Sequence, residues 1–135
     1  MLTQPSAARR YHEAQILNAT PVKLICLLYA GAQRFLEKGE TAMQNRNRAE
    51  AGNQINRAMA VIGELKASLD RDKGGQIAAD LERLYQFVLA QCLEANLRQN
   101  PQNLQAARQI LMPLQEGFET IARQQAGLPP TPPQA

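Results

Sequence analysis

The chain has few residues of the types that carry out catalysis. Its one histidine, His12, lies near the N-terminus, and its two cysteines are Cys26 and Cys92. A carboxylate-bridged di-metal site in a helical protein needs Glu-x-x-His on two helices, which a single histidine cannot supply. A Ser-His-Asp triad would also depend on His12. We therefore expect no catalytic residues, no metal site and no cofactor.

The cysteines and the glycine pair also lack the surroundings that such chemistry needs. A nucleophilic cysteine requires a basic neighbour and solvent access, and the sequence shows neither beside Cys26 or Cys92. Gly74-Gly75 lacks the Gly-x-x-x-x-Gly-Lys spacing of a phosphate loop and is typical of a turn with positive φ. We expect a binding protein rather than an enzyme. Histidine phosphotransfer through His12 is kept as an alternative, although such bundles place their histidine in mid-helix.

The composition indicates one helical domain. The chain has 135 residues, of which 44% are hydrophobic but only 4% are aromatic, and tryptophan is absent. The core must therefore be aliphatic, and the frequent Ala, Leu, Gln, Arg and Glu are good helix formers. The formal net charge is only +3 with both signs interleaved, so we expect no nucleic-acid partner.

The N-terminus and the hydropathy pattern bear on location. The first residues are polar and contain no apolar core of a secretory signal. No apolar run approaches the roughly 18 residues that a membrane helix requires. We therefore expect a cytoplasmic protein without membrane insertion, with Cys26 and Cys92 as free, mostly buried thiols.

Apolar residues recur every three or four positions on both sides of the segment 70–75, and residues at that spacing share one helix face. The stripe before this segment consists of Ile55, Met59, Ile62, Leu65 and Leu69. The stripe after it consists of Ile77, Leu81, Leu84, Val88, Cys92 and Ala95. This predicts helices over about 47–69 and 76–99, joined by a polar, glycine-bearing turn into an antiparallel pair. Asn47 and Glu50 fit a capping pattern at the start of the first of these helices.

Two further helices flank this pair. Thr20-Pro21 predicts a helix that runs to about Gln44, because Thr caps helices and Pro is favoured at the first helical position. Asn100-Pro101 is again a capping residue followed by proline, and it predicts a helix that runs to about residue 125. Pro113 lies inside this last helix, so we expect a kink or a split near residues 109–113.

Four helices with short connections predict an all-α protein, an antiparallel four-helix bundle. We expect an N-terminal arm over residues 1–19, the bundle over 20–125, and a disordered Pro-rich tail over 126–135. The arm carries a few apolar groups and would lie in a groove of this bundle or of a partner. The apolar stripe of the helix after Thr20 is broad, which fits either a tightly packed core or a docking surface for a partner helix.

Several runs of residues resemble the signature of the FliS family of flagellar export chaperones, over about residues 11 to 123. They are Tyr11…Ile16-Leu17-Asn18-Ala19-Thr20-Pro21-Val22-Lys23-Leu24-Ile25…Leu28-Tyr29-Ala30-Gly31-Ala32, Glu64-Leu65…Ser68-Leu69-Asp70, Gly74-Gly75-Gln76-Ile77-Ala78, Leu81…Leu84-Tyr85 and Leu93-Glu94-Ala95-Asn96. The chain departs from the family pattern at Ala30, Gln76, Asp80 and Phe118, where the family favours Asp, Glu, Asn and Trp. Pro113 is also outside that pattern.

The resemblance implies an antiparallel helical bundle that binds the disordered C-terminal segment of flagellin in the cytoplasm. Such a protein prevents premature polymerisation and keeps flagellin ready for the flagellar type III export apparatus. The resemblance also implies that the N-terminal arm can cover part of the flagellin groove. A bundle that dimerises, or that binds another protein without a flagellin client, is the alternative.

We predict that the client contacts apolar residues of the arm and of the helices that begin at Thr20 and after Gly75. These candidate partner-binding residues are Tyr11, Ile16, Leu24, Ile25, Leu28, Tyr29, Ile77, Leu81 and Tyr85. Each of them could instead be a core residue. The free protein is expected to be a monomer or a weak homodimer.

Overall fold

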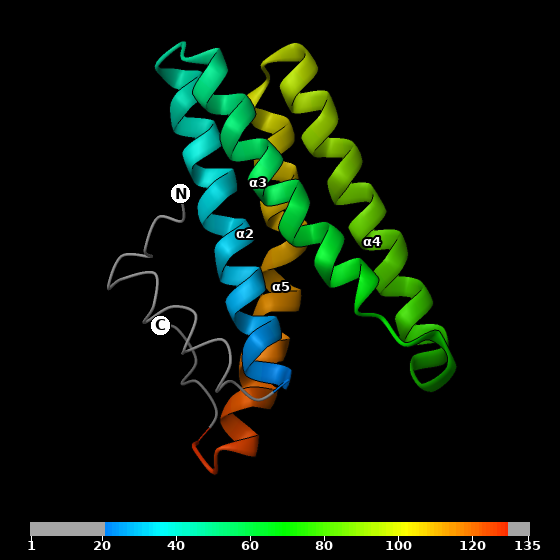
Figure 1. The fold of residues 1–135 in the computed structure, drawn as a ribbon. Helices are drawn as coiled ribbons and strands as arrows, with labels where there is room; N and C mark the ends of the chain where they lie inside the picture. Colours follow the sequence, from blue (N-terminus) through cyan, green and yellow to red (C-terminus); the bar gives the residue numbers. More distant parts are fainter. Residues whose placement is uncertain (1–20, 130–135) are drawn as a thin grey trace, which may run out of the picture.

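The computed structural model describes residues 21–129 of the chain (Figure 1). Within this range the secondary structure consists of four helices without strands: α2 (Pro21–Gln44), α3 (Arg48–Ala67), α4 (Arg71–Arg98) and α5 (Pro101–Gln125). The all-α prediction is confirmed. The predicted arm, with Tyr11, His12 and Ile16, and residues 130–135 of the predicted tail lie outside the described residues.

The helices form an antiparallel four-helix bundle, as predicted (Figure 1). Each helix packs against its neighbour in sequence, and α5 packs against α2 to close the bundle. Short connections enforce this order, because three residues between α2 and α3 leave the chain room only to turn back. Among the described residues, no helix is both long and apolar enough to cross a membrane.

The predicted helix starts are largely confirmed by their capping contacts. The side-chain oxygen of Asn47 accepts the backbone N–H of Glu50 at 3.1 Å. Asn100 accepts the N–H of Gln102 at 3.0 Å, and Pro101 follows as the first helical residue. Each cap satisfies an N–H group that the first helical turn would otherwise leave unpaired.

The start of α4 was predicted in part: the continuous helix after Gly75 was expected, but the capped turn before it was not. The helix begins at Arg71, because the carboxylate of Asp70 accepts the N–H groups of Asp72 and Lys73, each at 3.1 Å. One capped turn precedes Gly75, whose φ of 51° and ψ of −125° interrupt the helix before it continues. The positive φ expected from the glycine pair is thus found at Gly75, but inside the helix rather than in a linker.

The predicted split of the last helix at Pro113 is wrong, because α5 is one helix from Pro101 to Gln125. Pro113 and Gln109 are both exposed. The carbonyl group that Pro113 leaves without an amide partner, four residues earlier, therefore faces water, which lowers the cost of the proline.

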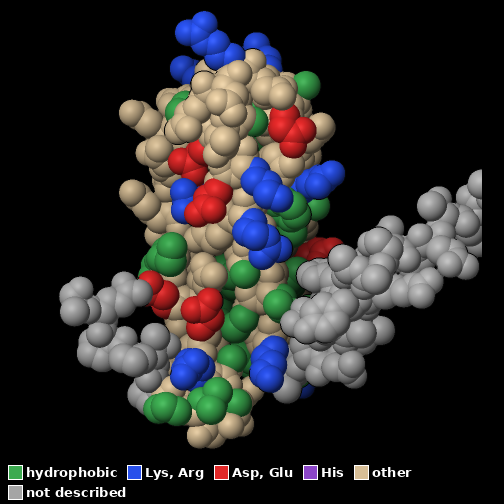
Figure 2. All heavy atoms as spheres, turned by 90° about the vertical axis from the view of Figure 1, so that its left-hand side faces the viewer, with side chains coloured by type: hydrophobic (Ala, Val, Ile, Leu, Met, Phe, Trp, Pro, Cys, Tyr) green, Lys and Arg blue, Asp and Glu red, His purple; other side chains and the backbone are tan. Residues whose placement is uncertain are grey.

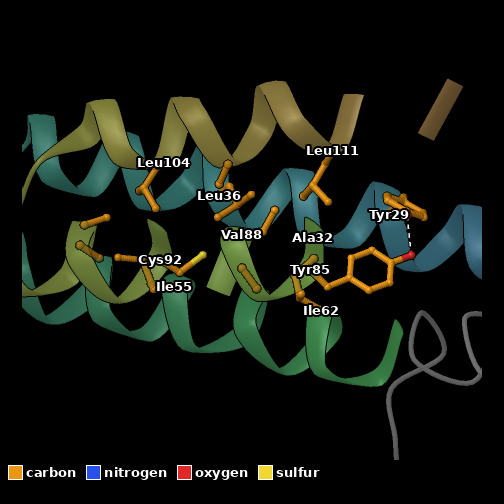
Figure 3. Close-up of a cluster of buried hydrophobic side chains, with 14 of the residues drawn as sticks. Tyr29, Ala32, Leu36, Ile55, Ile62, Tyr85, Val88, Cys92, Leu104 and Leu111 are labelled. Carbon is orange, nitrogen blue, oxygen red and sulfur yellow. Dashed lines mark hydrogen bonds between the residues drawn. The ribbon is translucent and has the colours of Figure 1, made fainter. Parts of the chain in front are cut away.

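The core is mainly aliphatic, as the composition predicted. Its fully buried side chains come from all four helices and include Leu36, Ile55, Val88 and Leu104 (Figure 3). Cys92 is buried among them and Cys26 is half buried, and both thiols are free. Among the described residues, no cluster of His, Cys, Asp and Glu could hold a metal ion.

The two helix pairs separate toward one end of the bundle. In Figure 1, the lower ends of α2 and α5 lie to the left of the lower ends of α3 and α4. The start of α2, the end of α3, the start of α4 and the end of α5 all lie at this end, since neighbouring helices are antiparallel. We call it the open end.

Candidate functional site

An apolar cleft of about 380 Å³ lies at the open end, between residues of all four helices. We call it the end cleft. Its lining residues are Ile25, Leu65, Ser68, Leu69, Asp70, Lys73, Gly74, Ile77, Ala78, Leu81, Tyr85 and Phe118. Aliphatic and aromatic side chains predominate, so the cleft suits an apolar side chain rather than a polar small molecule.

The floor of the end cleft is an aromatic cluster. Tyr85 borders the cleft, and its hydroxyl lies 2.6 Å from that of Tyr29 (Figure 3); both side chains are buried. The ring of Tyr29 stacks on Phe118, with 5.6 Å between the ring centroids and an interplanar angle of 30°. Burial raises the pKa of both tyrosines, so both hydroxyls stay protonated at neutral pH and form one hydrogen bond.

One wall of the end cleft is the first half of α4. Ile77 and Leu81 are four residues apart and therefore lie on one helix face. Leu81 is half buried, whereas 72% of the surface of Ile77 is exposed. The periodicity placed Ile77 in a core-facing stripe, but the helix pairs have separated at this point and none of the four described helices covers it.

The mouth of the cleft is shaped by the two glycines of α4. A Cβ atom at Gly74 would lie 2.8 Å from the Cβ of Ala78, closer than two carbon atoms can pack. Gly75 has backbone angles that only glycine adopts readily. The pair therefore lets the first turn of α4 fold against the cleft, which brings Lys73 into the lining.

The structure brings together part of the predicted partner-binding set. The residues that line the end cleft are Ile25, Ile77, Leu81 and Tyr85. Tyr29 lies beneath the cleft, in contact with Tyr85 and Phe118. Leu24 and Leu28 are half buried elsewhere on α2 and do not line it. Tyr11 and Ile16 are outside the described residues, and client contact by any of these side chains stays a prediction.

Several lining residues were absent from the predicted set. Leu65 of α3 and Leu69, which follows α3, belonged to a predicted stripe, and Phe118 stood out only as a replacement for the family's tryptophan. Periodicity identified these three positions as apolar. It could not show that they meet at one end, because that depends on where the helix pairs separate.

The open end also carries the more apolar part of the α2 face. Figure 2 shows hydrophobic side chains gathered over the lower half of this face, with acidic and basic side chains around and above them. Leu24 and Leu28 lie on α2 near its start, and because they are four positions apart they lie on one side of the helix. Apolar surface therefore extends beyond the end cleft along α2.

The fold and the end cleft together define a four-helix bundle with an apolar cleft at one end. The family model "Flagellar protein FliS" matches residues 4–125. The chain therefore belongs to the FliS family. This confirms the resemblance seen in the sequence.

Named relatives of the chain include proteins of three flagellated bacteria. The flagellar secretion chaperone FliSB of Pseudomonas aeruginosa is 34% identical over 110 residues, which cover 82% of this chain and 87% of that protein. The flagellar secretion chaperone FliS of Vibrio cholerae is 32% identical and covers 81% of this chain, with 80% of its own length matched. FliS of Salmonella typhimurium is 31% identical, with 82% of each chain covered.

The fold has a solved counterpart. The structure titled "Crystal structure of flagellar chaperone from bacteria" superposes with a TM-score of 0.72. It covers 87% of this chain and 96% of its own chain, at 19% sequence identity. At that identity, the likeness establishes the shared fold and nothing about binding.

Proposed function

We propose that this protein is a cytoplasmic chaperone that binds the C-terminal segment of flagellin at the end cleft and along the adjoining face of α2. Bound in this way, the segment would be kept from polymerising early and would stay competent for flagellar type III export. The main support for this proposal is the apolar cleft, whose wall includes the 72% exposed Ile77, in a chain of the FliS family.

The apolar wall itself supports a client. Covering Ile77 and Leu81 with a partner side chain would be favourable by about 25 cal/mol per Å² of buried apolar surface. An amphipathic segment of flagellin offers such side chains every three or four residues. A segment that folds as it binds loses part of this gain to ordering, which keeps the affinity moderate and allows release at the export apparatus.

The proposal is tested by calorimetry of the purified protein with a peptide of the flagellin C-terminal segment from the same bacterium. We expect 1:1 binding at micromolar concentrations or tighter. Ile77→Glu should weaken binding at least about tenfold, because it places a charge against the apolar segment. Leu97→Glu is the matched control, since Leu97 also lies on α4, is also 72% exposed and does not line the cleft.

Two outcomes would count against this assignment. If the wild-type protein shows no 1:1 complex at micromolar concentrations, the chaperone function is wrong. If Leu97→Glu weakens binding as much as Ile77→Glu, the client lies elsewhere on α4. Light scattering with and without peptide separates the client complex from self-association, because we propose that the free protein is a monomer or a weak homodimer.

We further propose that the arm, with Tyr11 and Ile16, is a displaceable cover of the client surface. A cover competes with the client, so the apparent affinity is reduced by the fraction of molecules in which the surface is occupied. Deletion of residues 1–19 should then tighten peptide binding, and Tyr11→Ala with Ile16→Ala should act in the same direction. Weaker binding after deletion would instead identify the arm as part of the client site.

A further inference from the structure

The end cleft carries a positive charge without an internal partner. Its two charged lining residues are Asp70 and Lys73. The carboxylate of Asp70 caps the helix and keeps its negative charge, because its Oδ1 atom accepts the N–H groups of Asp72 and Lys73 at 3.1 Å each. Lys73 is exposed and has no acidic partner among residues 21–129.

The other charges on the first turn of α4 do not compete for this position. Arg71 forms an ion pair with Glu82. Asp72 is exposed and does not line the cleft. The cation that an occupant of the cleft meets is therefore the ammonium group of Lys73, which lies beside the capping carboxylate of Asp70 in the lining.

Lys73 and Ile77 are four residues apart and both line the cleft, with Gly75 between them. An aliphatic side chain that packs against Ile77 and Leu81 therefore lies close to the lysine. Four methylene groups give the ammonium a flexible reach. A carboxylate on the occupant, within about one helical turn of that aliphatic side chain, would meet this cation as water leaves the cleft.

We propose that Lys73 is a specificity-determining residue of the end cleft. It selects a client segment in which an aspartate or glutamate side chain lies within about one helical turn of the aliphatic residues that fill the cleft. This inference rests on the proposed chaperone function and adds the chemistry of the residue that the cleft recognises beside its apolar contacts.

A side-chain carboxylate suits the position better than the C-terminal carboxylate of the client. Sites for chain ends use several backbone N–H groups together. Here the N–H groups of Asp72 and Lys73 donate to the Asp70 side chain, and that of Gly74 donates to the Asp70 carbonyl at 2.7 Å. A terminal carboxylate would thus find only the lysine, which a side chain inside a helical segment reaches equally well.

The test is a double-mutant cycle between Lys73 and the acidic residues of the flagellin peptide, measured by calorimetry at about 50 mM and 300 mM salt. Lys73→Met keeps the stem and removes the charge. It should weaken binding about threefold to tenfold at low salt and reduce the salt dependence. Lys73→Arg should stay close to wild type, Lys73→Glu should bind more weakly than Lys73→Met, and Asp72→Asn is the control on the same turn.

Variants of the peptide identify which of its carboxylates interacts with Lys73. Each Asp or Glu of the peptide is changed in turn to Asn or Gln, and one such change should weaken binding to the wild type but not to Lys73→Met. The amidated and free-acid forms of the peptide should bind alike. If wild type binds and Lys73→Met binds equally well, or if only the terminal carboxylate couples to Lys73, this inference is overturned while the chaperone function stands. If wild type does not bind, both fail.

Discussion

Tyr29 and Tyr85 lie on α2 and α4 and join their hydroxyl groups at 2.6 Å below the floor of the end cleft. Both tyrosines are buried, with Tyr29 0% and Tyr85 2% exposed, and Tyr85 also borders the cleft. A buried hydroxyl without a partner is costly, so each tyrosine allows the other to be buried. The pair links the two helix pairs near the point where they separate.

Removing one hydroxyl of this pair should cost more than removing both. Tyr85→Phe leaves the buried Tyr29 hydroxyl without a hydrogen-bond partner and should lower the free energy of unfolding by about 1–3 kcal/mol. Tyr29→Phe should cost a similar amount, because Tyr85 is only 2% exposed and its hydroxyl would lose the same partner. The double variant should be more stable than the sum of the single changes predicts. Urea unfolding measures the coupling, and strict additivity would show that the hydrogen bond does not form.

Burial of Cys92 should make the protein less stable in alkali. Burial raises the pKa of its thiol to about 12, above the value of about 8.5 that an unfolded chain has. As pH rises from about 8.5 toward 12, the unfolded state loses the proton first. The free energy of unfolding should therefore fall by up to about 1.4 kcal/mol per pH unit for this group. The raised pKa values of Tyr29 and Tyr85 act in the same direction above about pH 10.

Cys92→Ala isolates the contribution of this thiol. The variant should be less stable at pH 7 by about 1 kcal/mol, and its stability should fall less steeply between pH 9 and 10. Urea midpoints at each pH measure both effects. An unchanged slope would mean that the thiol ionises in the folded protein, and rapid labelling of Cys92 by a thiol reagent under native conditions would show the same.

Two glycines should respond in opposite ways to alanine. Gly75 has a φ of 51° and a ψ of −125°, so Gly75→Ala forces an L-residue into a strained conformation and should cost about 1–3 kcal/mol. Gly63 lies inside α3, where an added Cβ would meet no atom within 4 Å. Gly63→Ala should therefore stabilise the protein by about 0.5–1 kcal/mol. Equal effects of the two changes in urea unfolding would show that Gly75 is not held in this conformation.

Local chemistry in the sequence predicted most of the fold. Proline and asparagine at helix starts, together with the three-and-four spacing of apolar residues, act over one or two turns and are visible without the structure. The boundary of α4 was missed because Asp70 looked like one charge in a polar turn, whereas it caps the helix. The effect of Pro113 was overestimated because its burial could not be known from sequence.

The end cleft was only partly predictable. Ile77 and Leu81 stood out as apolar positions, but the same periodicity describes a core residue and a groove residue equally well. What separates them is the divergence of the two helix pairs, a property of packing between helices distant in sequence. The sequence likewise could not show that the Lys73 side chain lacks an acidic partner. In the structure, the nearby Asp70 carboxylate instead accepts backbone N–H groups at the helix start.

Closure of the bundle depends on a second long-range contact, between α5 and α2. Arg108 donates to Glu40 at 2.8 Å and to Glu37 at 2.6 Å, and its carbonyl accepts from Gln33 at 3.1 Å. The two acids differ in burial, because the Glu40 side chain is 9% exposed and that of Glu37 is 57% exposed. The pair with Glu40 should therefore contribute far more to stability than the pair with Glu37.

Arg108→Ala should leave Glu40 as a nearly buried charge without its partner. The expected loss is about 2 kcal/mol, between the value below about 1 kcal/mol of exposed ion pairs and the 3–5 kcal/mol of fully buried ones. Glu37→Ala should change stability by less than about 1 kcal/mol. Replacing both ends, with Arg108→Met and Glu40→Leu, should recover part of the loss, because no charge is then stranded. Urea unfolding of the three variants measures these effects. A double variant less stable than Arg108→Ala would mean that the ion pair itself, rather than the cost of an unpaired Glu40, stabilises the closed bundle.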